Sequence, residues 1–253
     1  MNAHMSDLRA TDSIVPSWPV AARVRAFVTT RNGGVSSGPY ASLNLGYGGD
    51  ADAAVTENRR RVQRHLPAPP TWLRQVHGAD VRDVGSPDAT APTADAAVTR
   101  AHHVPLVVMI ADCLPVFLAE RDGATVGVAH AGWRGLSAGV LERTVAAMRC
   151  APRDLVAWIG PGIGPQSFEV GRDVFDAFVA RDSAASAAFT PLREGKWLGD
   201  LPQLARRRLS AAGVVDVHGI DACTMRDPAR FFSYRRDGAS GRMGAFIWIE
   251  AGP

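Results

Sequence analysis

Short apolar runs separated by turn residues dominate the hydrophobic pattern of this 253-residue chain. Runs rich in β-branched and aromatic residues predict strands, at Val24–Thr30, Thr71–His77, Ala96–Thr99, Pro105–Ala111, Val116–Ala119, Thr125–Ala129, Leu155–Gly160, Val214–Ile220 and Gly244–Glu250. Apolar residues at helical spacing predict helices, over 50–66, Leu136–Met148, Asp173–Ala180 and Leu201–Ala212. Because the strands come in clusters and do not alternate strictly with helices, the pattern favours an α+β fold over a doubly wound sheet.

The pattern gives no sign of a domain boundary beyond the N-terminal segment. Residues 1–22 contain Pro16 and Pro19 and little apolar periodicity, so we expect a flexible leader there. Internal repeats and low-complexity linkers are absent from the sequence. We therefore expect a single domain over residues 23–253.

Composition narrows the class of protein. The formal net charge is +3, and every basic residue except Lys196 is an arginine. The arginine runs 59–61 and 206–208 fall in predicted helices, where a solvated face explains them, so no nucleic-acid partner is expected. Residues 1–19 are polar and lack the apolar core of a signal peptide, and no apolar run approaches the length of a membrane span. Three cysteines without a C-x-x-C motif fit a reducing compartment. We expect a cytoplasmic protein without a membrane partner.

Three strand ends carry candidate catalytic side chains. His77, Cys113 and His130 each follow an apolar strand and precede a turn that contains Gly or Pro. Two imidazoles and a thiolate suit zinc or copper, and three protein ligands leave a fourth position open, as in catalytic zinc sites. The long separations along the chain also fit a buried structural cysteine and two unrelated histidines.

Other segments carry features of an anion or base site. The glycine-rich residues 29–36 could bind an anion through backbone N–H groups, although they lack the P-loop signature. Arg31, Arg59 and Arg134 could bind phosphate or carboxylate. The aromatic residues of the 231–236 run, beside two arginines, could stack on a planar base. Taken singly, each segment fits a plain turn, a surface arginine or a core strand equally well.

Taken together, the motifs are specific. The segments T-T-R-N-G-G-V-S-S-G-P-Y-A-S-L-N-L-G, Q-V-H-G-A-D, A-D-C-L-P-V, H-A-G-W-R-G, G-P-G-I-G and R-F-F-S-Y-R-R-D-G-A-S-G-R-M occur between Thr29 and Ile249. In this order they resemble the laccase-domain family, whose members were first called polyphenol oxidases and are now viewed as purine nucleoside phosphorylases. The resemblance implies a compact α/β sandwich of mixed sheets flanked by helices, with metal ligands His77, Cys113 and His130. Gln166 stands where a cysteine is common in the family.

The resemblance also implies an activity. Adenosine, inosine and methylthioadenosine would react with phosphate to give a free base and ribose 1-phosphate or its methylthio analogue, with adenosine deamination as a side activity. Zinc is the expected cofactor, with copper as the alternative. We expect Cys113, His77 and His130 to be catalytic as metal ligands, Arg59 and Arg31 to bind phosphate, and Asn44 to bind a sugar hydroxyl or the base. A monomer or a homodimer is expected.

Three other functions stay open at this point. A copper-dependent polyphenol oxidase is one, although seven histidines are too few for the centres of a multicopper enzyme. A cysteine hydrolase acting on peptidoglycan precursors is another, with Cys113 as nucleophile and His130 or His77 as base. Asp112 would point to the other face of a strand and would orient that base poorly. The third is a binding module without catalysis.

Overall fold

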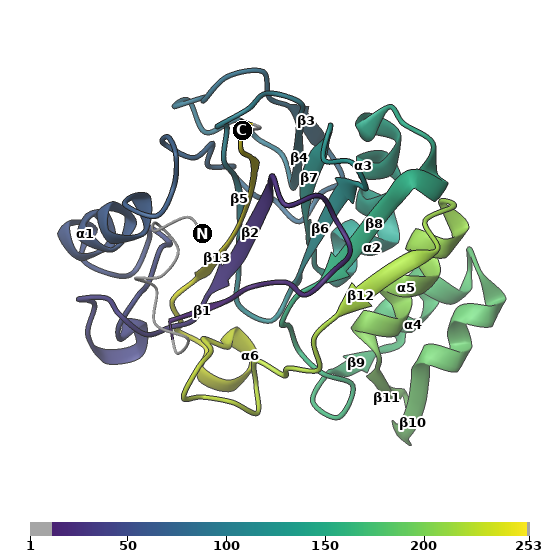
Figure 1. The fold of residues 1–253 in the computed structure, drawn as a ribbon. Coiled ribbons are helices and arrows are strands. Elements are labelled where there is room, and N and C mark those ends of the chain that lie inside the picture. Colours follow the sequence, from purple (N-terminus) through teal and green to yellow (C-terminus); the bar gives the residue numbers. More distant parts are fainter. Residues whose placement is uncertain (1–11, 252–253) are drawn as a thin grey trace.

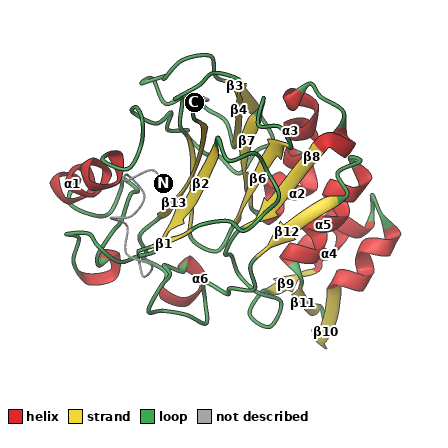
Figure 2. Cartoon of the chain, viewed as in Figure 1, coloured by secondary structure: helices red, strands yellow, loops and turns green. Residues whose placement is uncertain are grey.

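The computed structural model describes residues 12–251 and arranges them in layers. A six-stranded sheet lies in the middle of the molecule, with a four-stranded sheet on one face and a group of helices on the other (Figure 1). A further helix lies beyond the four-stranded sheet. Figure 2 shows that the helices are concentrated on the opposite face of the six-stranded sheet. This is the α+β class that the clustered strands predict.

The elements follow one another in the order β1 Ser13–Ile14, β2 Val24–Thr29, α1 Asp52–Gln63, β3 Val81–Asp83, β4 Ala96–Thr99, β5 Leu106–Ile110, β6 Leu114–Glu120, β7 Val126–Ala131, α2 Trp133–Ala138, α3 Val140–Met148, β8 Leu155–Ile159, β9 Glu169–Gly171, α4 Arg172–Val179, β10 Phe189–Arg193, β11 Lys196–Gly199, α5 Leu201–Ala211, β12 Asp216–Gly219, α6 Tyr234–Asp237 and β13 Met243–Ile249. Short 3-10 helices occupy Gly38–Tyr40, Pro152–Asp154 and Ser183–Ala188.

The sheets are of mixed direction. The six-stranded sheet has the order β12-β8-β6-β7-β4-β3, in which the outer pairs β12/β8 and β3/β4 are parallel and the inner pairs are antiparallel. The four-stranded sheet, β1-β2-β13-β5, is antiparallel throughout. A small antiparallel sheet, β10-β11-β9, lies beside α4.

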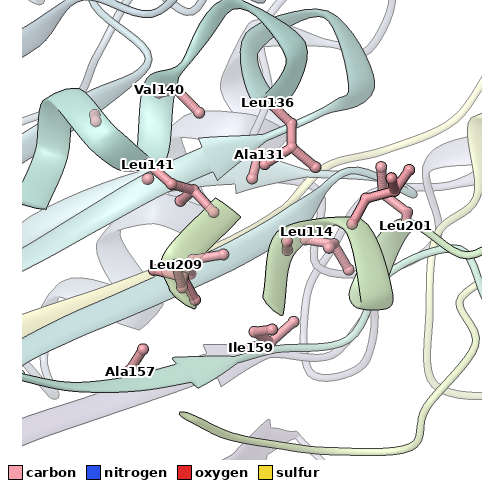
Figure 3. Packing of buried hydrophobic residues seen from close by; sticks show 14 of the residues in the cluster. Leu114, Ala131, Leu136, Val140, Leu141, Ala157, Ile159, Leu201 and Leu209 are labelled. Atoms are coloured by element: carbon pink, nitrogen blue, oxygen red, sulfur yellow. The ribbon is translucent and has the colours of Figure 1, made fainter. Parts of the chain in front are cut away.

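Burial on both faces explains why the strands read as continuous apolar runs. In β6, Val116 and Leu118 pack towards the helices, while Phe117 and Ala119 pack towards the four-stranded sheet. Figure 3 shows the helix side of this core: side chains of β6, β7 and β8 meet those of α2, α3 and α5. The outer face of the four-stranded sheet packs on α1 through its own apolar cluster, which includes Val62.

One predicted strand does not form. Over residues 71–77 the structure has only two isolated bridges, Thr71 to Leu106 and Arg74 to Thr93. At Gln75 the side-chain amide makes the hydrogen bonds that the backbone of a strand would make. Its Nε2 donates to the Met109 carbonyl, and its Oε1 accepts from the Met109 N–H. The segment therefore follows the edge of β5 through a side chain, which an apolar pattern does not reveal.

Other boundaries also differ from the prediction. The helix predicted over Leu136–Met148 is two helices, because Gly139 takes a left-handed conformation with φ 94° between α2 and α3. The small sheet β9–β11 was missed, since its exposed strands carry no apolar alternation. Within the predicted leader, Ser13–Ile14 pairs with β2 and Trp18 packs on Phe117, so this part is attached to the core. Residues 1–11 of that leader lie outside the described residues.

None of the helices in residues 12–251 combines the length and the apolar character that a membrane span requires.

We predict that Phe117 is among the strongest contributors to the core between the sheets. Its side chain is fully buried and stacks on Trp158 with ring centroids 5.7 Å apart. Phe117→Ala should lower the free energy of unfolding by about 3–5 kcal/mol, measured by chemical denaturation. The control Val15→Ala removes an apolar side chain that is 54% exposed, and should change it by less than about 0.5 kcal/mol. Equal losses in the two variants would contradict the prediction.

Candidate active site

His77, Cys113 and His130 meet at one point, as the sequence predicts. One ligand atom from each side chain lies within 4.8 Å of the others. The imidazole rings of His77 and His130 are edge to face, with centroids 4.9 Å apart. His130 is buried, Cys113 is half-buried and His77 is exposed, so the group opens to solvent on the His77 side.

Turn geometry brings the three residues together from separate segments. His130 is near the end of β7, directly opposite Pro115 of β6. Cys113 comes just before β6, after Asp112, which has the positive φ of 90° that turns the chain between β5 and β6. His77 also has a positive φ, 59°. Left-handed backbone is uncommon for residues other than glycine and clusters at functional sites.

A buried carboxylate holds two of the three ligands. Asp95 is fully buried, and its Oδ1 lies 2.8 Å from Nδ1 of His130. The same carboxylate accepts the backbone N–H groups of Val76, His77 and Gly78 at 3.1, 3.0 and 2.7 Å. Asp95 therefore orients the His130 ring, leaving Nε2 to face the centre, and fixes the turn that presents His77. In metal sites, the histidine ligand commonly donates its other ring N–H to a carboxylate in this way.

The electrostatics of the group favour a thiolate. Burial acts to raise the pKa of Cys113, but the charges and hydrogen bonds of His130 and His77 outweigh it and lower the pKa to about 6. Burial acts to lower the pKa of His130, yet the Cys113 thiolate and Asp95 raise it to about 9. For Asp95, burial is outweighed by the hydrogen bonds from His130, Gly78 and Val76, so its pKa is lowered. The directions of the two shifts favour the thiolate form of Cys113 and the imidazolium form of His130.

The local packing leaves room for an ion. A Cβ atom placed on Gly132 would lie 2.6 Å from Sγ of Cys113 and 3.3 Å from the His77 ring. Glycine at this position therefore keeps the space beside the thiolate open. The donor set, the mutual distances and this space all fit a first-row transition metal held by three protein ligands. The geometry suits the metal-ligating role predicted for His77, Cys113 and His130.

The group forms part of the wall of a cavity of about 720 Å³. This volume suits a small-molecule substrate. The other walls carry aromatic and apolar side chains, together with four arginines that the fold collects from distant segments, namely Arg74, Arg134, Arg235 and Arg242.

These four arginines are not neutralised by carboxylates. Arg242 donates to the carbonyls of Ser240 and Gly241, Arg235 to that of Glu169, and Arg74 to the Thr93 hydroxyl. Arg134 lies over the Trp133 ring at 4.4 Å. Among the described residues, none of the four lies in an ion pair, whereas many arginines elsewhere on the surface do. The lining contains these four arginines and the carboxylate of Asp112, so positive charges outnumber negative ones and the cavity suits an anion.

The predicted substrate residues lie outside the cavity lining. Asn44 is buried, and its amide bonds Gly46, Asp50 and the backbone N–H of Arg242. Arg31 donates to the carbonyls of Ala41 and Pro228. Arg59 is held between two aromatic rings. In this structure all three support the loops around the cavity, and Asn44 in particular joins the Gly46 loop to Arg242.

Sequence reasoning missed several lining residues. Gln75 and Arg242 lie within the quoted family motifs but were not singled out as site residues, and Arg74 lies just outside them. The place of all three in the cavity depends on which loops meet. A signal existed for Tyr234 and Arg235, because the aromatic–arginine run 231–236 was singled out, and both residues line the cavity. Arg134 was likewise a candidate and lies there.

Comparison with known proteins shows the family to which the chain belongs. A family model described as multi-copper polyphenol oxidoreductase laccase matches residues 25–250. A protein of Xylella fastidiosa strain Temecula1 named purine nucleoside phosphorylase is 51% identical over 250 residues, which cover 93% of this chain and 96% of the relative. The Escherichia coli K12 protein named purine nucleoside phosphorylase YfiH is 49% identical over 240 residues, covering 93% and 98%.

Solved structures of similar sequence have the same fold as this chain. Protein NMB0706 of Neisseria meningitidis has a TM-score of 0.93 at 46% identity, covering 95% of this chain and 100% of that one. YlmD of Geobacillus stearothermophilus has a TM-score of 0.89 at 34% identity, covering 96% and 98%. The resemblance noted in the sequence is confirmed: the chain belongs to the laccase-like family whose model is described as multi-copper polyphenol oxidoreductase laccase.

Proposed function

We propose that this protein is a metal-dependent purine nucleoside phosphorylase. Adenosine, inosine and methylthioadenosine are the proposed substrates, with deamination of adenosine as a side activity. One observation carries the proposal: a single cavity joins a His/Cys/His group to four arginines without acidic partners. The names of the relatives, purine nucleoside phosphorylase, support the same reaction class.

The reaction needs an anion and an open site. A phosphate oxygen forms a bond to C1′ of the ribose, the bond between C1′ and the purine nitrogen breaks, and the base leaves with that electron pair and takes up a proton. The cavity arginines, Arg242 foremost, would hold the phosphate against C1′ through charge-assisted hydrogen bonds. The apolar and aromatic walls would bind the base and exclude water, which would otherwise compete with phosphate.

His77, Cys113 and His130 would hold zinc, for which their donor types are suited, with copper as the alternative. When bound, such an ion acts as a Lewis acid that polarises a substrate oxygen or lowers the pKa of water. Asp95 keeps the His130 ring in the orientation that binding needs. We also propose a cytoplasmic location, which free Cys113, Cys150 and Cys223 support, and a monomer or homodimer.

A second candidate function rests on the same residues. Cys113, His130 and Asp95 form the sequence of contacts found in cysteine hydrolases, in which a base activates the thiol and a carboxylate orients the base. This favours hydrolysis, for example of peptidoglycan precursors, if the site works without metal. The polyphenol oxidase alternative has weaker support, because residues 12–251 contain one metal-ligating group of this kind, and a multicopper centre needs more.

We predict that Cys113→Ala loses the metal and the activity together. Metal content, measured by elemental analysis, should fall from about one ion per chain to near zero, and inosine cleavage should fall by roughly 100-fold or more. The matched control is Cys150→Ala, which removes a half-buried thiol outside the cavity and should change neither.

The same assay separates the candidates. Wild-type protein stripped by a chelator should lose phosphate-dependent cleavage and regain it with zinc. Full activity of the stripped protein, together with inactivation by alkylation of Cys113, would instead support the cysteine hydrolase. Oxygen uptake with a phenol by copper-loaded protein would support the oxidase.

We predict that Arg242→Ala weakens phosphate binding specifically. Among residues 12–251, Nε and Nη2 of Arg242 donate no hydrogen bond, and its backbone N–H donates to Oδ1 of Asn44, which holds the residue at the cavity. The KM for phosphate should rise roughly 10- to 100-fold, the range expected for hydrogen bonds to a charged group. Arg172→Ala, which removes an exposed arginine paired with Asp176, serves as the control. Unchanged phosphate KM in Arg242→Ala would assign the anion to another cavity arginine.

A further inference from the structure

Tyr47 is an exposed aromatic residue at the cavity that is held rigidly before any ligand arrives. Its side chain is 51% exposed and forms part of the cavity lining. The guanidinium of Arg59 lies over one side of the ring, 4.4 Å from the centroid, and the hydroxyl lies 3.2 Å from Oγ1 of Thr56 on α1. An exposed ring with these contacts has little rotamer entropy left to lose on binding.

Arg59 is itself fixed by the fold. Its guanidinium lies 3.6 Å from the centroid of Trp72, on which it stacks, and its Nε donates to the Leu45 carbonyl at 2.9 Å. Burial lowers the pKa of Arg59 to about 10, which is still above neutral pH, so the side chain keeps its charge. Trp72, Arg59 and Tyr47 thus form one stack, which ends with the Tyr47 ring at the cavity.

The stack belongs to the same wall as the metal-ligating group. Nη2 of Arg59 contacts Sδ of Met109 at 3.8 Å, and the backbone of Met109 bonds the side chain of Gln75. Gln75 precedes His77 by two residues, and Met109, Gln75 and His77 all line the cavity. A ligand that reaches the open side of the group at His77 therefore comes close to this wall.

The other aromatic rings of the cavity are less suited to stack on a flat ligand. Trp133 also has a guanidinium over its ring, that of Arg134 at 4.4 Å, but Trp133 is only partly exposed. Phe168 is 5% exposed and has Arg235 at 5.5 Å. Tyr234 is exposed, but its nearest cation, Arg242, lies 5.9 Å from the ring, so Tyr234 lacks a close support. Tyr47 alone among the lining rings combines exposure with a cation close behind it.

We infer that Tyr47 stacks on the purine base of the substrate and that Arg59 is a positioning residue that holds the Tyr47 ring for this contact. The inference rests on the proposed function. It assigns the recognition of the base to Tyr47, which lies outside the motifs quoted in the sequence analysis. A cation on one face draws electron density from the ring, which favours an electron-rich purine on the other face. Stacking is tolerant of base identity, so adenine and hypoxanthine should both bind.

The test is direct binding of free hypoxanthine to the full-length protein, measured by isothermal titration calorimetry. Tyr47→Ala should weaken this binding on the order of 10-fold, as expected for the loss of one base–aromatic stack. Tyr47→Phe keeps the ring and should bind as the wild type does, which separates stacking from the Thr56 contact. Arg59→Lys keeps the charge and loses the planar guanidinium, so it should weaken hypoxanthine binding by a smaller factor.

Kinetics provides the second readout. In Tyr47→Ala the KM for inosine should rise by a similar factor, while the KM for phosphate and the bound metal stay unchanged, which a general loss of structure would not produce. Unaltered hypoxanthine binding in Tyr47→Ala, no binding to the wild type, or a larger loss in Tyr234→Leu would overturn the inference. Absence of nucleoside cleavage by the wild type, with hypoxanthine binding still dependent on Tyr47, would overturn the proposed phosphorylase and leave the base site standing.

Discussion

The geometry of the site depends on the buried carboxylate of Asp95. This one side chain forms a hydrogen bond with the imidazole of His130 and accepts hydrogen bonds from three consecutive backbone N–H groups. It therefore fixes both the orientation of the His130 ring and the turn that carries His77. A fully buried carboxylate is costly unless its oxygens are satisfied, and here these donors satisfy it. The backbone N–H of His130 also donates to the Asp95 carbonyl, at 2.7 Å, which ties β7 to the same point.

The layered sheets make this arrangement rigid. β6 and β7 are buried on both faces, so their ends, which carry Cys113 and His130, are anchored by packing on two sides. Glycine contributes where side chains would intrude: a Cβ on Gly135 would lie 2.6 Å from the Gly78 carbonyl, next to the His77 turn. The group of His77, Cys113 and His130 thus lies where three independently supported segments meet.

Besides forming surface ion pairs, arginine has two uses around the cavity. Some arginines bind backbone carbonyls or aromatic rings inside the fold, as Arg31 and Arg59 do, and these stabilise loops. Others face the cavity without a carboxylate partner, as Arg242 and Arg134 do, and these give it a positive field. The residue type is the same in each case, and only its surroundings decide whether the guanidinium is committed to the protein or open to a ligand.

Much of the fold and the centre of the site follow from the sequence. Apolar runs located the inner strands, because burial on both faces requires such runs. The chemistry of the donors and the family motifs predicted a group of His77, Cys113 and His130, since few residue types bind transition metals, and the fold brings the three side chains together. Gly139, which splits the predicted helix, and Gln75, which replaces a strand by side-chain bonds, lay beyond pattern reading.

The tertiary structure alone decided which polar side chains face the cavity. Asn44 and Arg31 belong to a conspicuous motif, yet their hydrogen bonds join loops to one another. Asp95 and Tyr47 lie outside the quoted motifs, because their roles arise from contacts between segments far apart in the chain. Sequence by itself determined the donor chemistry and the layers, which are local properties of residue type and pattern. The burial and pairing of each charge depend on three-dimensional packing, and so only the folded chain could decide them.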